Sequence, residues 1–468
     1  MTTAEKPLAG VRGEGVKLKR VLSTPQLVGF GLAYINLIGV FILYGLVTQM
    51  THGMMALAFL ISTLAMGLTA ASYASLSRKF VSAGSVYSYV QRSIGSRTAF
   101  MVGWIVMLDY LVLPLLNFLL VGLYMHQLLP GVPQWVFTLA ALLLIVGLAI
   151  KGVSESAKLG VIATIVGVGF LVVFAGFIIT SITGEGAGVG AIFDVSGFYS
   201  AEAMNNPDVG FTAILGACSL LCLMFLGFDG ITAFAEETKN PQKQIGSAIM
   251  WTCIIAGIVY VGFSYLMQLA WPTAWSEMAD PDVASTELIL RIGGPVMNMI
   301  FTAIFVIGCI GSGMSGLSAG ARILYVMGNN GALPKKLSAV HAKYRTPYIA
   351  ILLIGAIGVL SVFSNLTDIS SIVNFGALVA FMAVNACVLL QLRIKDRERG
   401  AKSLLLHVIL PVLGFAVNFT IWINLDVTAK IIGFAWAALG LIILGWQTKG
   451  FRQPLNTPMA TQPEPETT

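Results

Sequence analysis

Long apolar stretches separated by short polar segments run along almost the whole chain. Each is long enough to cross a bilayer, whose hydrocarbon core needs about 20 residues of helix. The pattern predicts twelve membrane-spanning helices, at 26–50, 53–76, 99–128, 134–150, 158–182, 211–235, 244–271, 294–321, 347–363, 370–392, 404–425 and 429–447. The ninth stretch is short, but it carries no charged residue. We therefore expect an all-α integral membrane protein.

Lysine and arginine residues are distributed very unevenly between these helices. If the N-terminus is cytoplasmic, 25 of the 27 lie in cytoplasmic segments, and only Arg291 and Lys430 lie on the other side. Cytoplasmic loops of membrane proteins carry an excess of these residues. We predict a multi-pass protein of the cytoplasmic (inner) membrane with both termini in the cytoplasm, where 1–25 and 448–468 form polar tails.

The composition agrees with this interpretation and excludes other classes. The chain is 57% hydrophobic and 10% charged, whereas soluble proteins carry about 25% charged residues. The net charge of +6 follows from the cytoplasmic loops and indicates no nucleic-acid partner. The five cysteines lie in apolar stretches, as packed free thiols do, and neither they nor the four histidines have metal-ligand spacing. Without a phosphate-binding loop, cofactor or metal, the expected energy source is an ion gradient.

Two acidic residues interrupt the apolar helices. Asp109 lies about ten residues into the third helix, and Asp229 lies late in the sixth, between Gly227 and Gly230. An ionisable residue inside a span is costly, which makes it a functional candidate. No lysine or arginine inside a helix is available to pair with either. The structural alternative is an aspartate that is protonated or hydrogen-bonded to hydroxyl and backbone groups.

Glycine and asparagine mark two places where helices are expected to break. The first helix contains Asn36 and Gly39 in an apolar run, and the sixth has its two glycines around Asp229. Unwound backbone in a membrane is tolerated only where it lines a cavity or is covered by protein. Helices interrupted at matching places in two halves of a chain are a good sequence pointer to a substrate site. The first and sixth helices, five spans apart, fit that arrangement.

Other polar residues are weaker candidates. Tyr110 beside Asp109 could hold an ammonium group by cation–π attraction, or it could be ordinary helix packing. Ser312 belongs to a row with Ser315 and Ser318 that favours close helix packing. In the tenth helix, Asn374 is the better site candidate of its two asparagines. Glu236 and Glu237, at the cytoplasmic end of the sixth helix, suit gating and surface ion pairs equally well.

Three motifs resemble the amino acid–polyamine–organocation superfamily of permeases. They are Phe228-Asp229-Gly230 through Asn240-Pro241, Ala321-Arg322 through Pro334, and Ser82 through Tyr89. Within the superfamily the chain is most similar to bacterial putrescine importers, through Gly31-Leu32-Ala33-Tyr34, Leu108-Asp109-Tyr110 and Asn374-Phe375-Gly376. Two features differ from some of these relatives: the interior of the fifth helix has no lysine beyond Lys158, and the broken part of the first helix has no acidic residue.

The resemblance implies a five-plus-five inverted repeat with two added helices and uptake by alternating access. The repeats would be 26–182 and 211–392, followed by 404–447. It also implies a substrate site between the broken helices. That site would contain Asn36, Ile38, Gly39, Asp109, Tyr110, Phe228, Asp229, Ser312 and Asn374. Coupling and gating would fall to Asp109, Asp229, Glu236, Glu237 and Arg322.

The sequence therefore predicts a secondary active transporter that is not an enzyme. Its substrate would be a putrescine-like polyamine or a related amine, with a proton rather than sodium as the coupling ion. The alternative is a proton-coupled permease or exchanger for zwitterionic amino acids. A channel lacks its repeated filter motif here, and a membrane enzyme lacks its nucleophile–base pair. A sensor with transporter architecture has no distinguishing sequence feature, and the oligomeric state stays open.

Overall fold

The described part of the chain is helical. The computed structural model describes residues 22–80, 86–151, 154–184, 189–207, 209–235, 237–329 and 333–453. Within these residues, eleven helices are long and apolar enough to cross a membrane, and one further apolar helix, Tyr348–Phe363, is shorter. The short helix is the ninth of the predicted spans. The membrane-protein class is thus as predicted, with eleven of the expected spans found as membrane-length helices in the described residues and the ninth as a shorter apolar helix.

The helices of the first part of the chain are α1 (Thr24–Ile35), η1 (Leu37–Phe41), α2 (Tyr44–Thr51), α3 (Met55–Lys79), α4 (Val86–Ser93), α5 (Ser96–Leu128), α6 (Gln134–Lys151) and α7 (Ser154–Thr183). Short helices follow at η2 (Val189–Phe193), η3 (Val195–Gly197) and α8 (Ala201–Asn205). The next set is α9 (Gly210–Leu221), η4 (Cys222–Phe225), η5 (Asp229–Phe234), α10 (Pro241–Ala270), α11 (Ala274–Glu277) and α12 (Ala284–Asn329). The last are η6 (Lys335–Ser338), α13 (Tyr348–Gly358), η7 (Val359–Phe363), α14 (Leu366–Val388), η8 (Leu389–Lys395), α15 (Ala401–Leu404), η9 (Leu405–Ile409), α16 (Leu410–Ile423) and α17 (Val427–Gln447).

Two elements differ from the sequence prediction. The segment before 99 contains the amphipathic helix α4, which is too short and too polar to register as an apolar stretch. The eighth span begins ten residues earlier than predicted, because helix continues on both sides of a kink at Gly294. Gly294 has a φ of 74° and precedes Pro295, which has no amide hydrogen to donate. Residues 284–293 are therefore helical, although the apolar stretch of the sequence starts only after the kink.

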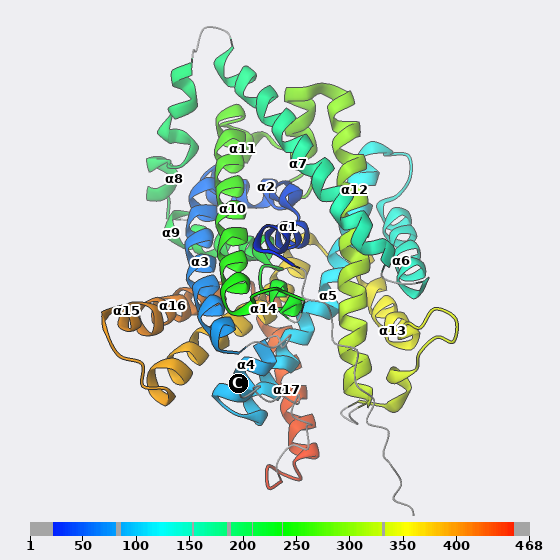
Figure 1. The fold of residues 1–468 in the computed structure, drawn as a ribbon. Coiled ribbons are helices and arrows are strands. Elements are labelled where there is room, and N and C mark those ends of the chain that lie inside the picture. Colours follow the sequence, from blue (N-terminus) through cyan, green and yellow to red (C-terminus); the bar gives the residue numbers. More distant parts are fainter. Residues whose placement is uncertain are drawn as a thin grey trace, which may run out of the picture.

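The long helices pack around α5. This helix lies between α12 and α14, while α3 and α10 form a second closely packed pair (Figure 1). The broken first helix lies in the middle of the molecule, with α1 against α10. There Gly31 lies so close to Thr252 that an added Cβ would come within 2.6 Å of its hydroxyl oxygen. The fold therefore brings the first helix against the helix that follows the sixth.

Aromatic side chains fill the bundle beyond the first break. Phe41 packs edge-on against Phe301, with ring centroids 5.0 Å apart, and also contacts Phe170 and Phe174. Tyr124 adds a ring 5.8 Å from Phe301. At the opposite end of α1, Leu22 forms a short parallel bridge with Thr238, through amide–carbonyl bonds to the residues on either side of it. Both ends of the broken helix are thus attached to the rest of the bundle.

The last helix is fixed to α5 by a pair of tryptophans. The indoles of Trp104 and Trp436 stack with centroids 4.7 Å apart. Each indole N–H donates to the backbone carbonyl of the other residue at 2.8 Å. Gly440 makes room for this pair, since an added Cβ would lie 2.3 Å from the Trp104 ring. This reciprocal contact anchors α17 to the helix that carries Asp109.

Lipid-facing and internal positions differ as expected for a membrane protein. Apolar side chains such as Val172, Ile258 and Val296 are 68–69% exposed on the outer faces of their helices. The five cysteines are buried and unpaired, which confirms that they are packed free thiols.

Candidate functional site

The first helix breaks at Asn36. This residue ends α1 in the left-handed conformation, with φ 57° and ψ 83°, and the chain continues as the short helix η1. Asparagine tolerates this conformation better than most residues do. The first amides of a helix have no acceptor within it, so a break of this kind presents donors inside the protein. The predicted break at Asn36 is present.

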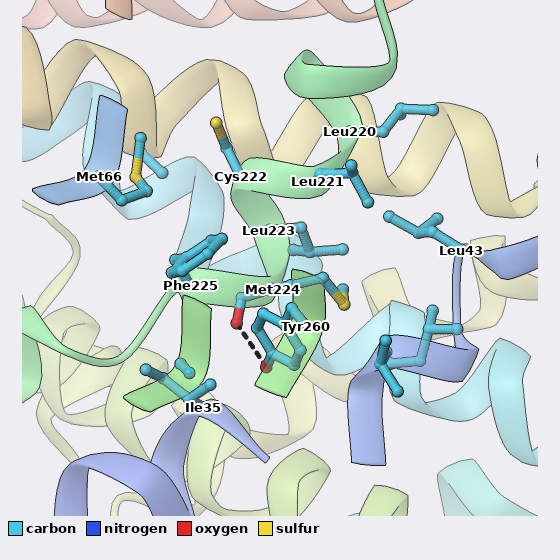
Figure 2. Packing of buried hydrophobic residues seen from close by; sticks show 14 of the residues in the cluster. Ile35, Leu43, Met66, Leu220, Leu221, Cys222, Leu223, Met224, Phe225 and Tyr260 are labelled. Atoms are coloured by element: carbon cyan, nitrogen blue, oxygen red, sulfur yellow. Dashed lines mark hydrogen bonds between the residues drawn. The ribbon is translucent and has the colours of Figure 1, made fainter. Parts of the chain in front are cut away.

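The sixth helix breaks between η4 and η5. Leu226 is extended there and Gly227 has a φ of 120°, so the helix resumes only at Asp229. The hydroxyl of Tyr260 donates to the carbonyl of Met224 at 3.0 Å, as Figure 2 shows beside the packed residues of η4. This bond satisfies one of the carbonyls that the break leaves without a helical partner. The predicted interruption around Asp229 is therefore present too.

Asn374 supports the same break from α14. Its side-chain amide donates to the carbonyls of Ser219 and Leu220 at 2.8 and 3.0 Å. The residue is fully buried. Its nitrogen is therefore engaged in holding the end of α9, and only its oxygen, buried without a partner among the described residues, is free to receive a hydrogen bond.

The two breaks lie against each other. An added Cβ on Gly39 would be 3.4 Å from the sulfur of Met224. One on Gly227 would be 2.0 Å from the ring of Tyr34. Gly227 is therefore required both by the close approach of Tyr34 and by its positive φ, whereas the contact of Gly39 with Met224 is ordinary van der Waals packing.

Asp229 is the first residue after the sixth-helix break. Backbone groups at Gly227, Asp229 itself and Gly230 lie near its carboxyl group. Its carbonyl accepts a bond from the hydroxyl of Thr232 at 2.8 Å. The break thus places the carboxyl group beside backbone groups, while the residue keeps partial exposure.

Asp109 lies on the continuous helix α5. Gly376 of α14 packs against it, so that an added Cβ would come within 3.5 Å of the Asp109 Cβ. The Oδ1 atom of Asp109 is buried and has no hydrogen-bond partner among the described residues. A buried polar atom without a partner costs about 1–3 kcal/mol. This oxygen is therefore available to a proton or to a donor from a ligand.

The two carboxyl groups belong to one cluster. They are close enough to interact electrostatically with each other. Tyr34 and Tyr110 each interact with both carboxyl groups, and Tyr73 interacts with Asp229. No ion pair joins either aspartate to a lysine or arginine in the described residues. The structure thus brings together two acidic groups and three phenol rings from α1, α3, α5 and the sixth helix.

Other predicted site residues lie beside this cluster, where Phe228 packs edge-on against Tyr73 with ring centroids 5.8 Å apart, or on other parts of the bundle. Phe228 is fully buried and stacks on Phe381 with centroids 5.4 Å apart. Ile38 is 2% exposed and faces Gly167 of α7. Asn36 places its amide near Gly308 of α12, where an added Cβ would lie 3.4 Å from the nitrogen. Phe228 and Ile38 are therefore packed in this conformation, and their contact with substrate stays a prediction.

The serine row on α12 has mixed surroundings. Ser315 donates to the carbonyl of Gly311 at 3.0 Å, and Ser312 is partly exposed. Ser318 is buried beside a cavity of about 60 Å³ that Arg322 and Arg345 also line. Arg322 itself is exposed.

The acidic pair after the sixth helix is only partly described. Glu236 lies outside the described residues. The carbonyl of Glu237 accepts the amide of Leu22 at 3.0 Å, which ties the start of the first helix to the end of the sixth. Gating by either residue stays a prediction.

Tyr34 and Tyr73 were not among the predicted site residues. In the sequence, Tyr34 stands out only as part of a family motif, and Tyr73 lies in an apolar span with nothing else to mark it as a site residue. A tyrosine in a membrane helix could have identified both, because its hydroxyl needs a hydrogen-bond partner in an apolar span. In Tyr73 that hydroxyl is buried without a partner among the described residues.

Comparison with known proteins agrees with this architecture. The amino acid permease family matches residues 30–444. The low-affinity putrescine importer PlaP of Escherichia coli is 35% identical over 94% of this chain and 96% of its own length. The branched-chain amino acid permease BcaP of Bacillus subtilis is 28% identical over 93% and 94%. The vacuolar cationic amino acid transporter 4 of Arabidopsis thaliana is 29% identical over 80% of this chain and 63% of its own.

The family match spans most of the chain, and these relatives are transporters. The helices long enough to cross a membrane and the two broken helices agree with that class. The chain belongs to the amino acid permease family and is a multi-pass membrane transport protein.

Proposed function

We propose that this protein is a secondary active transporter that imports a polyamine of the putrescine type, or a related amine, across the cytoplasmic membrane. The observation that supports the proposal is the pairing of Asp109 and Asp229 in one cluster without a described cationic partner. A relative 35% identical over 94% of the chain is named a putrescine importer.

Charge balance favours a dication. A diamine carries about two positive charges at neutral pH, and burying a charge without a partner is prohibitive. Two carboxylates can compensate two ammonium groups, one at Asp229 and one at Asp109. The unpartnered Oδ1 of Asp109 would then receive the hydrogen bond that it lacks.

A zwitterionic amino acid is the second candidate. The amides that begin η1 after Asn36 could hold its carboxylate, and the Asp229 region could hold its amine. Asp109 would then carry a proton through each cycle. Relatives named branched-chain amino acid permeases support this candidate.

The proposal includes the mechanism. The helices form two inverted repeats, 26–182 and 211–392, with 404–447 added, and the site alternates between the two sides of the membrane. Both termini face the cytoplasm, and a proton rather than sodium drives uptake. Because the interior of α7, 160–180, has no lysine, the proton carrier is proposed among the acidic residues Asp109, Asp229, Glu236 and Glu237, and an aspartate can serve only where the substrate does not need both carboxylates.

A substrate panel in proteoliposomes tests the proposal. Purified protein would be given labelled putrescine, longer polyamines, aromatic amines, and neutral and branched-chain amino acids, with and without an imposed pH gradient. Putrescine uptake that rises with an inward proton gradient and does not respond to sodium is expected. Uptake of neutral amino acids but not putrescine would establish the second candidate instead.

A further inference from the structure

Tyr34 occupies an unusual place at the end of α1. Its side chain is 44% exposed, although its ring lies directly over the backbone of Gly227 in the sixth-helix break. The absence of a side chain on Gly227 leaves the space that the ring fills. Tyr34 therefore touches the break and is still partly exposed.

The next aromatic residue on the same helix face shows the contrast. Phe30, one turn earlier, stacks on Phe234 with centroids 5.1 Å apart and an interplanar angle of 16°. Among the described residues, the ring of Tyr34 has no aromatic partner and its hydroxyl has no hydrogen-bond partner. The ring of Phe30 therefore has an aromatic partner, whereas the ring of Tyr34 contacts Gly227 and stacks on no described aromatic ring.

The charged groups around Tyr34 determine which kind of ligand could bind to its ring. Both Asp109 and Asp229 interact electrostatically with this tyrosine. An anionic or neutral group placed on the ring would gain nothing from these neighbours. An ammonium group would gain from the carboxylates and from the electron-rich face of the phenol.

We propose that Tyr34 contacts the substrate and binds its ammonium group on the ring by a cation–π interaction, so that the ring is an aromatic platform. Gly227, which has no side chain, leaves the space that positions this ring. This inference rests on the proposed amine transport and adds a residue that determines selectivity. The platform favours aliphatic amines over substrates whose bound end is uncharged.

Two substitutions of Tyr34 distinguish the contribution of its ring to substrate binding from that of its hydroxyl group. Tyr34→Phe keeps the platform, so KM for putrescine should stay within about twofold. Tyr34→Leu removes it, and the usual strength of cation–π contacts predicts a KM about 3- to 30-fold higher. Equal KM values for Tyr34→Leu and the wild type, in protein that elutes as folded, would overturn the proposal.

Gly227→Ala should reproduce the effect of Tyr34→Leu, because its methyl group would occupy the space of the ring. Adding it to Tyr34→Leu should raise KM little further. Gly400→Ala is the matched control, since Gly400 has a similar φ of 115° but no atom within 4 Å of an added Cβ. Fully additive effects of the two site variants would show that Gly227 acts independently of the ring.

Thiol labelling tests the site without transport. The native cysteines are buried, so Tyr34→Cys adds an accessible thiol against a low background. We expect the cationic aminoethyl methanethiosulfonate to label it at least about tenfold faster than the anionic sulfonatoethyl reagent, relative to a free thiol. Asp229→Asn should reduce that preference. If the wild type takes up no putrescine, the proposed function fails, whereas an unreactive or charge-indifferent thiol refutes this inference specifically.

Discussion

The two carboxyl groups of the site have opposite surroundings. Asp229 begins a helix segment after a break, and backbone groups of the break lie near its carboxyl group. Asp109 lies on an unbroken helix, with Gly376 packed against its Cβ and with Oδ1 buried and unpartnered in the described structure. The same residue type thus lies beside the backbone of a broken helix at one position, and on a continuous helix with one unpartnered oxygen at the other.

This difference assigns different roles to the two residues. A carboxylate beside backbone N–H groups is favoured in its charged form, which suits the binding of a cation. A buried carboxyl oxygen without a partner gains a hydrogen bond only when a proton or ligand donor arrives. Breaking a helix therefore does more than open space, since it also leaves backbone groups without helical partners near a charge.

The largest effect is expected from Asp229→Asn. It removes the carboxylate that the broken helix holds, and loss of one partner from a buried charged contact costs about 2–5 kcal/mol. Putrescine uptake, measured as kcat/KM in proteoliposomes, should fall by about 100-fold or more. Uptake within a few-fold of the wild type would show that this carboxylate is not an amine partner.

Asp109→Asn is expected to discriminate between substrates. Putrescine uptake should fall by about tenfold or more, because the second ammonium group loses its charged partner. If the site also accepts neutral amino acids, their binding, measured by competition, should change far less. Unaltered putrescine uptake would contradict the two-carboxylate site.

Asn374→Leu tests whether Asn374 stabilises the break in the sixth helix, and it leaves the charge of the site unchanged. The carbonyls of Ser219 and Leu220 lose their amide donor, which should cost about 1–3 kcal/mol. We expect a lower melting temperature in detergent by a few degrees. Asn424→Leu is a control, because its amide bonds only within its own helix, to the carbonyl of Thr420. Equal melting temperatures for the two variants would show that Asn374 does not stabilise the break.

The smallest effect on stability is expected at Glu277, whose carboxyl group lies outside the membrane-spanning helices. The indole of Trp271 donates to it at 2.8 Å, and this bond, with help from Thr273 and Arg291, lowers its pKa below the usual value of 4.5. Lowering the pKa on folding stabilises the protein above the unfolded pKa, and this stability is lost as the pH falls through the folded value.

Melting temperatures measured from pH 6 to pH 3 should therefore fall slightly more steeply for the wild type than for Glu277→Gln, with the difference confined to below about pH 4.5. Parallel curves would show that the Trp271 contact contributes nothing measurable.

The sequence pattern predicts the helices well because lipid imposes a simple rule on apolar length. It also locates the breaks, since Asn36 and the glycines around Asp229 interrupt otherwise uniform spans. The pattern misses α4, because this short amphipathic helix contains too many polar residues to form an apolar stretch. It also misses the start of α12, because those residues precede the kink at Gly294.

Within the site, residue type predicts the acids better than their neighbours. A carboxylate in an apolar helix is conspicuous, whereas Tyr34 and Tyr73 differ from other buried aromatics by one hydroxyl. Asn374 is conspicuous too, but only the three-dimensional arrangement shows that its nitrogen faces the carbonyls of α9. Side-chain direction across helices distant in sequence cannot be obtained from spacing along one helix.

The tryptophan pair between α5 and α17 has a spectroscopic consequence. Indoles stacked 4.7 Å apart at an angle of 13° behave as coupled chromophores rather than as two independent ones. Near-ultraviolet circular dichroism can therefore record whether the last helix remains docked on the helix of Asp109, in lipid or detergent, without any added label. Loss of the coupled signal in Trp436→Phe would assign it, and would give preparations of this transporter an optical criterion of integrity.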